Sequence, residues 1–135
     1  MSAVRRFVPA ALCLLVAGWL LLARGDENHV RRAAQLGAQG RYRAAAAEAG
    51  QVHRRPAAAA AALLRGRALA GTRDFAASAA AYARAARLEP RDWTVRREYA
   101  RVLLALGRRA DARGQMAASL ALNPRQSVPA GFVAR

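Results

Sequence analysis

The sequence predicts an all-α fold in which an apolar N-terminal helix is followed by a short α-solenoid of about three helix-turn-helix repeats. Three observations lead to this prediction. An uncharged run extends from Phe7 to Ala23, prolines recur at intervals of 34 residues, and alanine-rich stretches of helical length lie between those prolines. A fixed period of this length is typical of stacked helical pairs. We therefore expect one supersecondary unit used three times.

The N-terminal segment, residues 1–25, is interpreted as a membrane signal-anchor. Its uncharged run over residues 7–23 is preceded by Arg5 and Arg6 and followed by Arg24. As a helix, this run would extend about 26 Å at 1.5 Å per residue. That length is at the low end for a hydrocarbon core of about 30 Å, and the flanking arginines can extend their charged ends towards the interfaces. A soluble buried helix is the alternative without a membrane.

The charges around the run predict its orientation. Arg5 and Arg6 favour an N-terminus inside the cytoplasm, and Asp26 and Glu27 follow the span. We expect a single-pass protein of the cytoplasmic membrane with its repeat domain outside the cytoplasm. A cleaved signal peptide is the alternative, because Ala23-Arg24-Gly25 resembles a small-x-small cleavage site. The remaining chain would then be secreted or periplasmic.

Three repeat units are expected over residues 26–58, 59–92 and 93–126, with a tail at 127–135. Arg87-Leu-Glu-Pro90-Arg aligns with Ala121-Leu-Asn-Pro124-Arg without a gap, and Pro56 stands 34 residues before Pro90. A turn divides each unit into two helical stretches. Two of the three turns contain a glycine, which suits the left-handed conformation at the end of a helix. Asp74 and Asp92 are predicted to be the N-caps of the helices that follow them. The turns are Gln39-Gly40-Arg41-Tyr42, Thr72-Arg73-Asp74-Phe75 and Leu106-Gly107-Arg108-Arg109.

The period and the residue types resemble the tetratricopeptide repeat family, whose pattern is W-x₂-L-G-x₂-Y, then A-x₃-F, then P. The resemblance covers residues 26–126 and implies a right-handed stack of helical pairs. The second and third units lack the tryptophan, and the first unit is degenerate. The matching residues are Gly66, Leu69, Ser78-x₃-Tyr82 and Pro90 in the second unit, Tyr99, Ala100, Leu103, Ala112-x₃-Met116 and Pro124 in the third, and Ala33, Leu36, Gly40-Arg-Tyr42 and Ala45-x₃-Ala49 in the first.

In this family the first helix of each pair lines a concave groove that holds an extended peptide or a helix of a partner. The resemblance assigns Arg67, Arg97 and Arg101 to that lining. Three guanidinium groups in one groove would favour carboxylates through bidentate hydrogen bonds, so we expect a protein partner with an acidic segment. The alternative is that the arginines are solvated or pair locally, as Arg87 or Arg91 could with Glu89 or Asp92.

Composition limits the other function classes. The 135 residues include 38 alanines and 23 arginines but no lysine or isoleucine, and the formal net charge is +15. A basic excess indicates nucleic acid, anionic lipid or acidic protein as partners, although a G/C-rich codon bias would also raise the arginine count. An aromatic content of 6% is low for a protein that stacks bases. We therefore do not expect nucleic acid as the partner.

Residues that could perform catalysis are few. The single cysteine, Cys13, excludes an internal disulfide and a zinc site with several cysteine ligands. His29 and His53 stand apart and are interpreted as solvated helical residues. No glycine-rich phosphate loop, nucleophile elbow or H-E-x-x-H motif is present. We expect no enzymatic activity, no cofactor and no metal site.

The expected function is that of a membrane-anchored adaptor or scaffold for protein–protein interaction in a bacterial envelope assembly. The alternative is a secreted or anchored basic protein that binds polyanions, meaning nucleic acid, anionic lipid or wall polymer, through its arginine-rich surface.

The C-terminal tail allows two interpretations. Val128, Phe132 and Val133 either fold back over the open end of the stack or leave it free for a partner or a second copy of the chain.

Overall fold

The computed structural model describes the backbone of residues 3–132 and the side chains of residues 12–132. This part of the chain contains six α-helices and no strand, so the predicted all-α class is confirmed. A short 3₁₀ turn follows the last helix. The elements are α1 (Ala3–Ala38), α2 (Tyr42–Gly50), α3 (Ala58–Gly71), α4 (Phe75–Leu88), α5 (Trp93–Ala105), α6 (Arg109–Leu122) and η1 (Ala130–Phe132).

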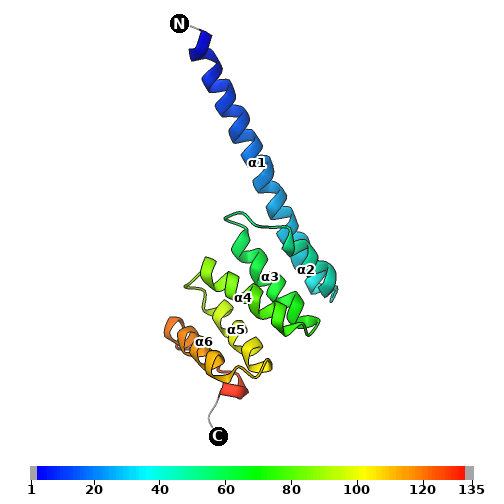
Figure 1. Cartoon of the computed structure of the whole chain (residues 1–135), viewed down its shortest axis with the longest axis vertical. Helices are drawn as coiled ribbons and strands as arrows, with labels where there is room; N and C mark the ends of the chain where they lie inside the picture. The colour runs from blue at the N-terminus through cyan, green and yellow to red at the C-terminus, as the bar shows by residue number, and fades with distance from the viewer. Residues whose placement is uncertain (1–2, 133–135) are drawn as a thin grey trace.

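The helices stack in chain order as successive hairpins (Figure 1). The end of α1 packs on α2, α3 packs on α4, and α5 packs on α6. The hairpins join through contacts of α2 with α3 and of α4 with α5, while α1 also contacts α3. Each hairpin therefore packs mainly on its neighbours, an arrangement compatible with a short α-solenoid.

The turns inside the hairpins form at the predicted places. Gly40 and Gly107 adopt φ angles of +73° and +75°, and Arg73 adopts φ 62° at the corresponding point of the second hairpin. This left-handed region costs glycine little but brings the Cβ of other residues close to the backbone. The glycines were recognisable from the sequence, whereas the strained conformation of Arg73 was not.

The predicted N-caps are confirmed. Asp74 accepts a hydrogen bond from the backbone N–H of Ala77 at 3.1 Å. Asp92 accepts hydrogen bonds from the N–H groups of Thr94 and Val95 at 2.8 and 3.3 Å. Asp92 is therefore used as a helix cap. The alternative local pairs of Arg87 or Arg91 with Glu89 or Asp92 do not occur among the ion pairs of the described residues.

Tyr82 forms the centre of the core. Alanines make up most of the buried residues, and Tyr82 is the largest side chain that is fully buried. Its ring lies on Gly66, where an added Cβ would stand 3.0 Å from two ring carbons. On the same side of α4, the hydroxyl of Ser78 donates a 2.7 Å hydrogen bond to the carbonyl of Gly66. Val95 and Val102 of α5 belong to the same cluster, so this contact joins three helices.

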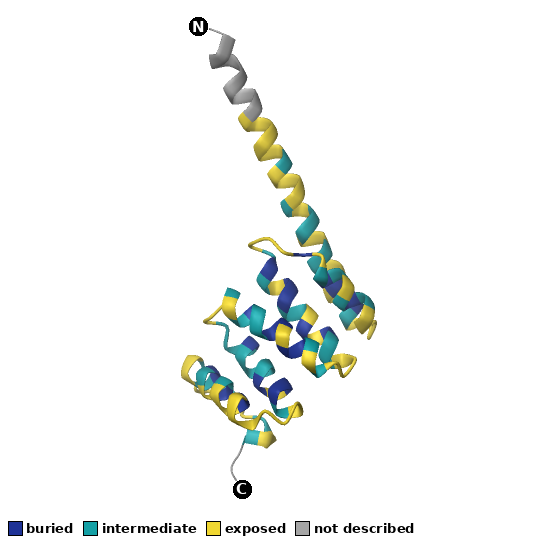
Figure 2. Cartoon of the chain, viewed as in Figure 1, coloured by how far each residue is buried: buried dark blue, intermediate teal, exposed yellow. Residues whose placement is uncertain are grey.

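The first half of α1 extends away from the helical stack, and its described residues are largely exposed (Figure 2). The helix continues without a break across residues 25 and 26, so the predicted anchor and the first repeat share one helix. Within the described part of the chain, no helix is long and apolar enough to cross a membrane. This finding does not support the membrane span predicted at residues 7–23. The side chains of residues 7–11 lie outside the described part.

The tail returns to the last hairpin. Gly131 of η1 lies against α5, where an added Cβ would clash with a methyl carbon of Leu104. Phe132 lines a hollow beside Leu104 and Gly107, whereas Val128 is exposed. The described part of the tail therefore covers part of the open end, as the first alternative expected. Val133 lies outside the described residues.

Arg73→Gly should stabilise the protein by about 1 kcal/mol, because a glycine removes the cost of a left-handed side chain. Urea unfolding followed by circular dichroism measures this change. Arg41→Gly is the matched control, since Arg41 already has φ −82° and gains nothing from glycine. Equal effects of the two substitutions would contradict strain at Arg73.

Gly66→Ala should destabilise the protein by about 1–3 kcal/mol, because the new methyl group overpacks the ring of Tyr82. The control is Gly114→Ala in α6, where nothing lies within 4 Å of the added Cβ. That change should stabilise the helix by about 0.5–1 kcal/mol. Unfolding midpoints that move in the same direction for both variants would refute the close packing described above.

Candidate functional site

The arginines assigned to the groove lie on two neighbouring first helices. Arg67 is on α3, and Arg97 and Arg101 are on α5. The chain of contacts from α3 through α4 to α5 brings Arg67 and Arg101 to the same buried tyrosine, Tyr82. Arg97 has different surroundings and is considered first.

Arg97 is held by its own helix. Its guanidinium lies over the ring of Trp93, 5.0 Å from the ring centroid, which is the geometry of a cation–π contact. Its Nη2 is 3.4 Å from Oε1 of Glu98, and only 25% of the side chain is exposed. Its planar face and one N–H group are therefore already engaged by neighbouring residues, and it is less exposed than Arg67 and Arg101, so Arg97 is less available to a ligand than the other two arginines.

The charges of Arg67 and Arg101 both act on the hydroxyl group of Tyr82. The pKa of Tyr82 is raised to about 12, mainly by burial and also by the negative charge of Glu98, while the charges of Arg67 and Arg101 oppose this shift. Arg101 also pairs with Glu98 at 3.2 Å, and 60% of its side chain is exposed. One carboxylate and two guanidinium groups thus surround a phenol whose ring is buried in the core.

This cluster borders a hollow of about 320 Å³, which we call the Tyr82 hollow. One part of its wall is apolar and comes from α3, α4 and α5. The other part carries the phenol, one carboxylate and one guanidinium. Such a surface can accept an apolar side chain beside a carboxylate. The lining residues are Ala70, Phe75, Tyr82, Glu98, Arg101, Val102 and Ala105.

Glu98 was missed by the sequence analysis. It contacts both Arg97 and Arg101, so it supplies the negative charge of the cluster. Its three-residue spacing from Arg101 places the two side chains on one helical face, and that spacing could have identified the pair. The predicted cations Arg97 and Arg101 are therefore both paired with a carboxylate of their own helix.

His29 corrects another sequence interpretation. Its Nδ1 lies 2.8 Å from Oε2 of Glu48, and Arg32 lies 3.2 Å from the other oxygen of the same carboxylate. The contacts of Glu48 with His29 and Arg32 lower its pKa. His29 is thus half-buried and joins α1 to α2, whereas His53 is exposed in the loop after α2. No group of metal-ligating residues occurs in the part of the chain that was described.

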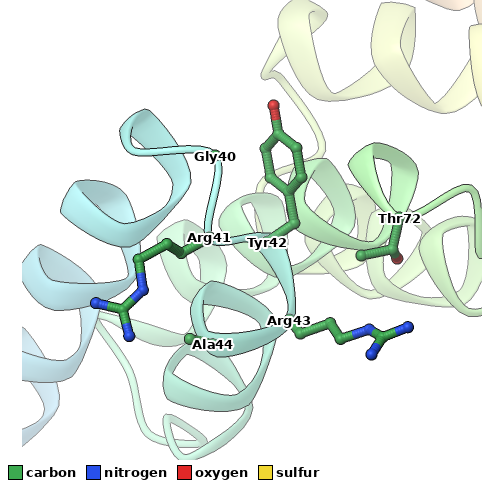
Figure 3. Close-up of a pocket in the computed structure, with 6 residues that line it drawn as sticks. All are labelled: Gly40, Arg41, Tyr42, Arg43, Ala44 and Thr72. Atoms are coloured by element: carbon green, nitrogen blue, oxygen red, sulfur yellow. The ribbon is translucent and has the colours of Figure 1, made fainter.

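A second hollow, of about 350 Å³, lies at the turn between α1 and α2 (Figure 3). Its lining includes Gly40, Tyr42 and Thr72. Figure 3 shows the side chains of Arg41 and Arg43 pointing to opposite sides, so their charges do not converge on one ligand. The Tyr82 hollow remains the better candidate because its polar groups lie together.

Comparison with known proteins gives no assignment: no protein-family model matches the sequence, and no curated protein matches it. The chemistry of the site must therefore be judged from its own residues.

The raised pKa of Tyr82 predicts a loss of stability in alkaline solution. The folded state holds the phenolic proton more tightly than the unfolded state, whose tyrosine pKa is about 10. The free energy of unfolding should therefore fall by about 1–2 kcal/mol as the pH rises from about 10 to about 12. Urea unfolding across this range measures the loss. Tyr82→Phe keeps the ring without the proton, so a fall of the same size in that variant would exclude Tyr82 as its source.

Proposed function

We propose that this protein is a membrane-tethered helical-repeat adaptor that holds an acidic segment of a partner protein against the Tyr82 hollow. The observation that carries the proposal is that Arg67 and Arg101, on adjacent hairpins, both act on one buried phenol. A second support is the apolar wall beside them, which offers a place for a neighbouring side chain of the same segment.

The charges of the cluster favour a carboxylate over a phosphate group. Glu98 neutralises part of the positive charge and already accepts a hydrogen bond from Arg101. A dianionic group would be repelled by this carboxylate, whereas one partner carboxylate can be shared between Arg67 and Arg101. An acidic side chain flanked by an apolar residue is therefore the segment that suits the hollow best.

The tether is supported by the exposed residues of α1. From Leu12 to Leu22, eight large apolar side chains are 48–75% exposed. Seven of them occur in one run of three and one run of four consecutive residues and so surround the helix on all sides, a pattern suited to lipid rather than to a one-sided protein groove. Residues 12–23 alone extend about 18 Å at 1.5 Å per residue, less than the hydrocarbon core. The uncharged residues 7–11 would supply the remaining length.

Polyanion binding is the second candidate, and it is favoured by the net charge of +15. Binding of that kind rests on many dispersed arginines and weakens steeply with salt. An adaptor site with a partly apolar wall should retain its partner at moderate salt. The salt dependence of binding therefore separates the two functions.

Arg67→Glu combined with Arg101→Glu should abolish capture of the partner, because the two cations that act on Tyr82 become anions. Cross-linking and mass spectrometry on tagged full-length chain in native membranes measures the loss, with about tenfold weaker capture expected for each arginine. The matched control is Arg65→Glu with Arg84→Glu. These arginines line a different hollow between α3 and α4 and undergo the same change of charge.

Loss of the same cross-links in both variants would indicate a general effect of charge and would favour polyanion binding. Unchanged cross-links in the Arg67 and Arg101 variant would refute the Tyr82 hollow as the binding site. Circular dichroism of each variant verifies that the helical stack is retained.

A further inference from the structure

We infer that the loop between α2 and α3, together with the adjoining part of α1, binds the anionic phosphate groups of the phospholipids around the tether. We call Arg24, Arg31, Arg54 and Arg55 the basic collar. This inference rests on the tether proposed above and adds a lipid preference to it.

The fold brings two distant segments of the sequence together at the collar. Pro56 and Ala57 of the loop share a hollow of about 370 Å³ with Glu27, Val30 and Arg31 of α1. In Figure 1 the loop lies at the end of the helical stack nearest the apolar segment. Arg54 and Arg55 directly precede this contact in the chain, so they stand beside α1 although about 30 positions separate the segments.

The distance from the apolar segment fits a headgroup site. Distances along the helix axis are counted from Leu22 at 1.5 Å per residue. On this scale Arg24 lies about 3 Å, Glu27 about 8 Å and Arg31 about 14 Å beyond Leu22. The polar region of a bilayer is about 5–8 Å deep on each side. An arginine can extend its guanidinium group back towards the interface. If Leu22 marks the edge of the hydrocarbon, Arg24 lies within the phosphate region. Arg31 and the loop lie just outside it, and their guanidinium groups extend back towards the phosphate groups.

The collar is available for an external anion. All four arginines are exposed, and none of them belongs to an ion pair among the described residues. Asp26 and Glu27 are the nearby carboxylates on α1, so the guanidinium groups outnumber them two to one. Arg32 is excluded from the collar because it pairs with Glu48. Guanidinium groups bind phosphate oxygens through paired hydrogen bonds, which suits an anionic headgroup.

Hydrogen exchange on the full-length chain in vesicles tests the collar. Vesicles of phosphatidylcholine alone are compared with vesicles of phosphatidylcholine and phosphatidylglycerol. We expect amide exchange in residues 51–57 to be at least about fivefold slower in the anionic vesicles than in the vesicles of phosphatidylcholine alone. This is the factor that corresponds to the attraction of one arginine to an anionic surface. High salt should remove this ratio, because exposed charges are screened.

Arg54→Gln with Arg55→Gln should bring the ratio close to one. Arg41→Gln with Arg43→Gln is the matched control, because these exposed arginines lie at the opposite end of α2 and lose the same charge. That variant should keep the wild-type ratio. An equal loss in both variants would overturn the collar and indicate a field of the whole domain.

Flotation of the vesicles distinguishes failure of the collar from failure of the tether. A chain that floats with both lipids but exchanges at the same rate in both overturns the collar and leaves the tether intact. A chain that floats with neither lipid overturns the tether, and the collar with it. Quenching of Trp19 by brominated lipid chains, lost in Trp19→Leu, verifies that the apolar segment enters the bilayer.

Discussion

The packing of the Tyr82 ring on Gly66 is the contact on which the helical stack depends most. Alanine fills most of the remaining core, and each buried methyl or methylene group contributes only about 0.8 kcal/mol. One large side chain therefore carries an unusual share of the apolar burial. It fits only because α3 has no Cβ at that point. Ser78 fixes the same crossing by its hydrogen bond to the Gly66 carbonyl.

The same tyrosine joins the core to the candidate site. Its ring is buried among α3, α4 and α5, while its hydroxyl end is influenced by Glu98, Arg67 and Arg101. A shift of α3 against α4 would therefore separate Arg67 from Arg101. The geometry of the hollow is set by the core packing rather than by a flexible loop.

Local features of the fold were predictable because they depend on short sequence patterns. The proline period located the hairpins, glycines located two of the turns, and Asp74 and Asp92 were recognisable as caps. Features that depend on tertiary packing were not. The left-handed conformation of Arg73 is imposed by the hairpin, and the contact of His29 with Glu48 joins residues 19 positions apart.

The candidate site follows the same division. Its arginines could be assigned from their positions in the repeats. The sequence did not show that Trp93 and Glu98 contact two of these arginines and so make them less available to a ligand. Because α1 continues from the apolar segment into the first hairpin without a linker, the helical stack cannot rotate freely about that segment. The contact of Glu48 with His29 and Arg32 fixes α1 against α2.

The pKa of Glu48 is lower in the folded protein than in the unfolded chain. The contact therefore stabilises the hairpin at pH values above the pKa of Glu48 in the unfolded chain. This stabilisation is lost as the pH falls through the pKa of Glu48 in the folded protein. Acidification should therefore loosen the packing of α1 on α2 before it affects the apolar cluster around Tyr82.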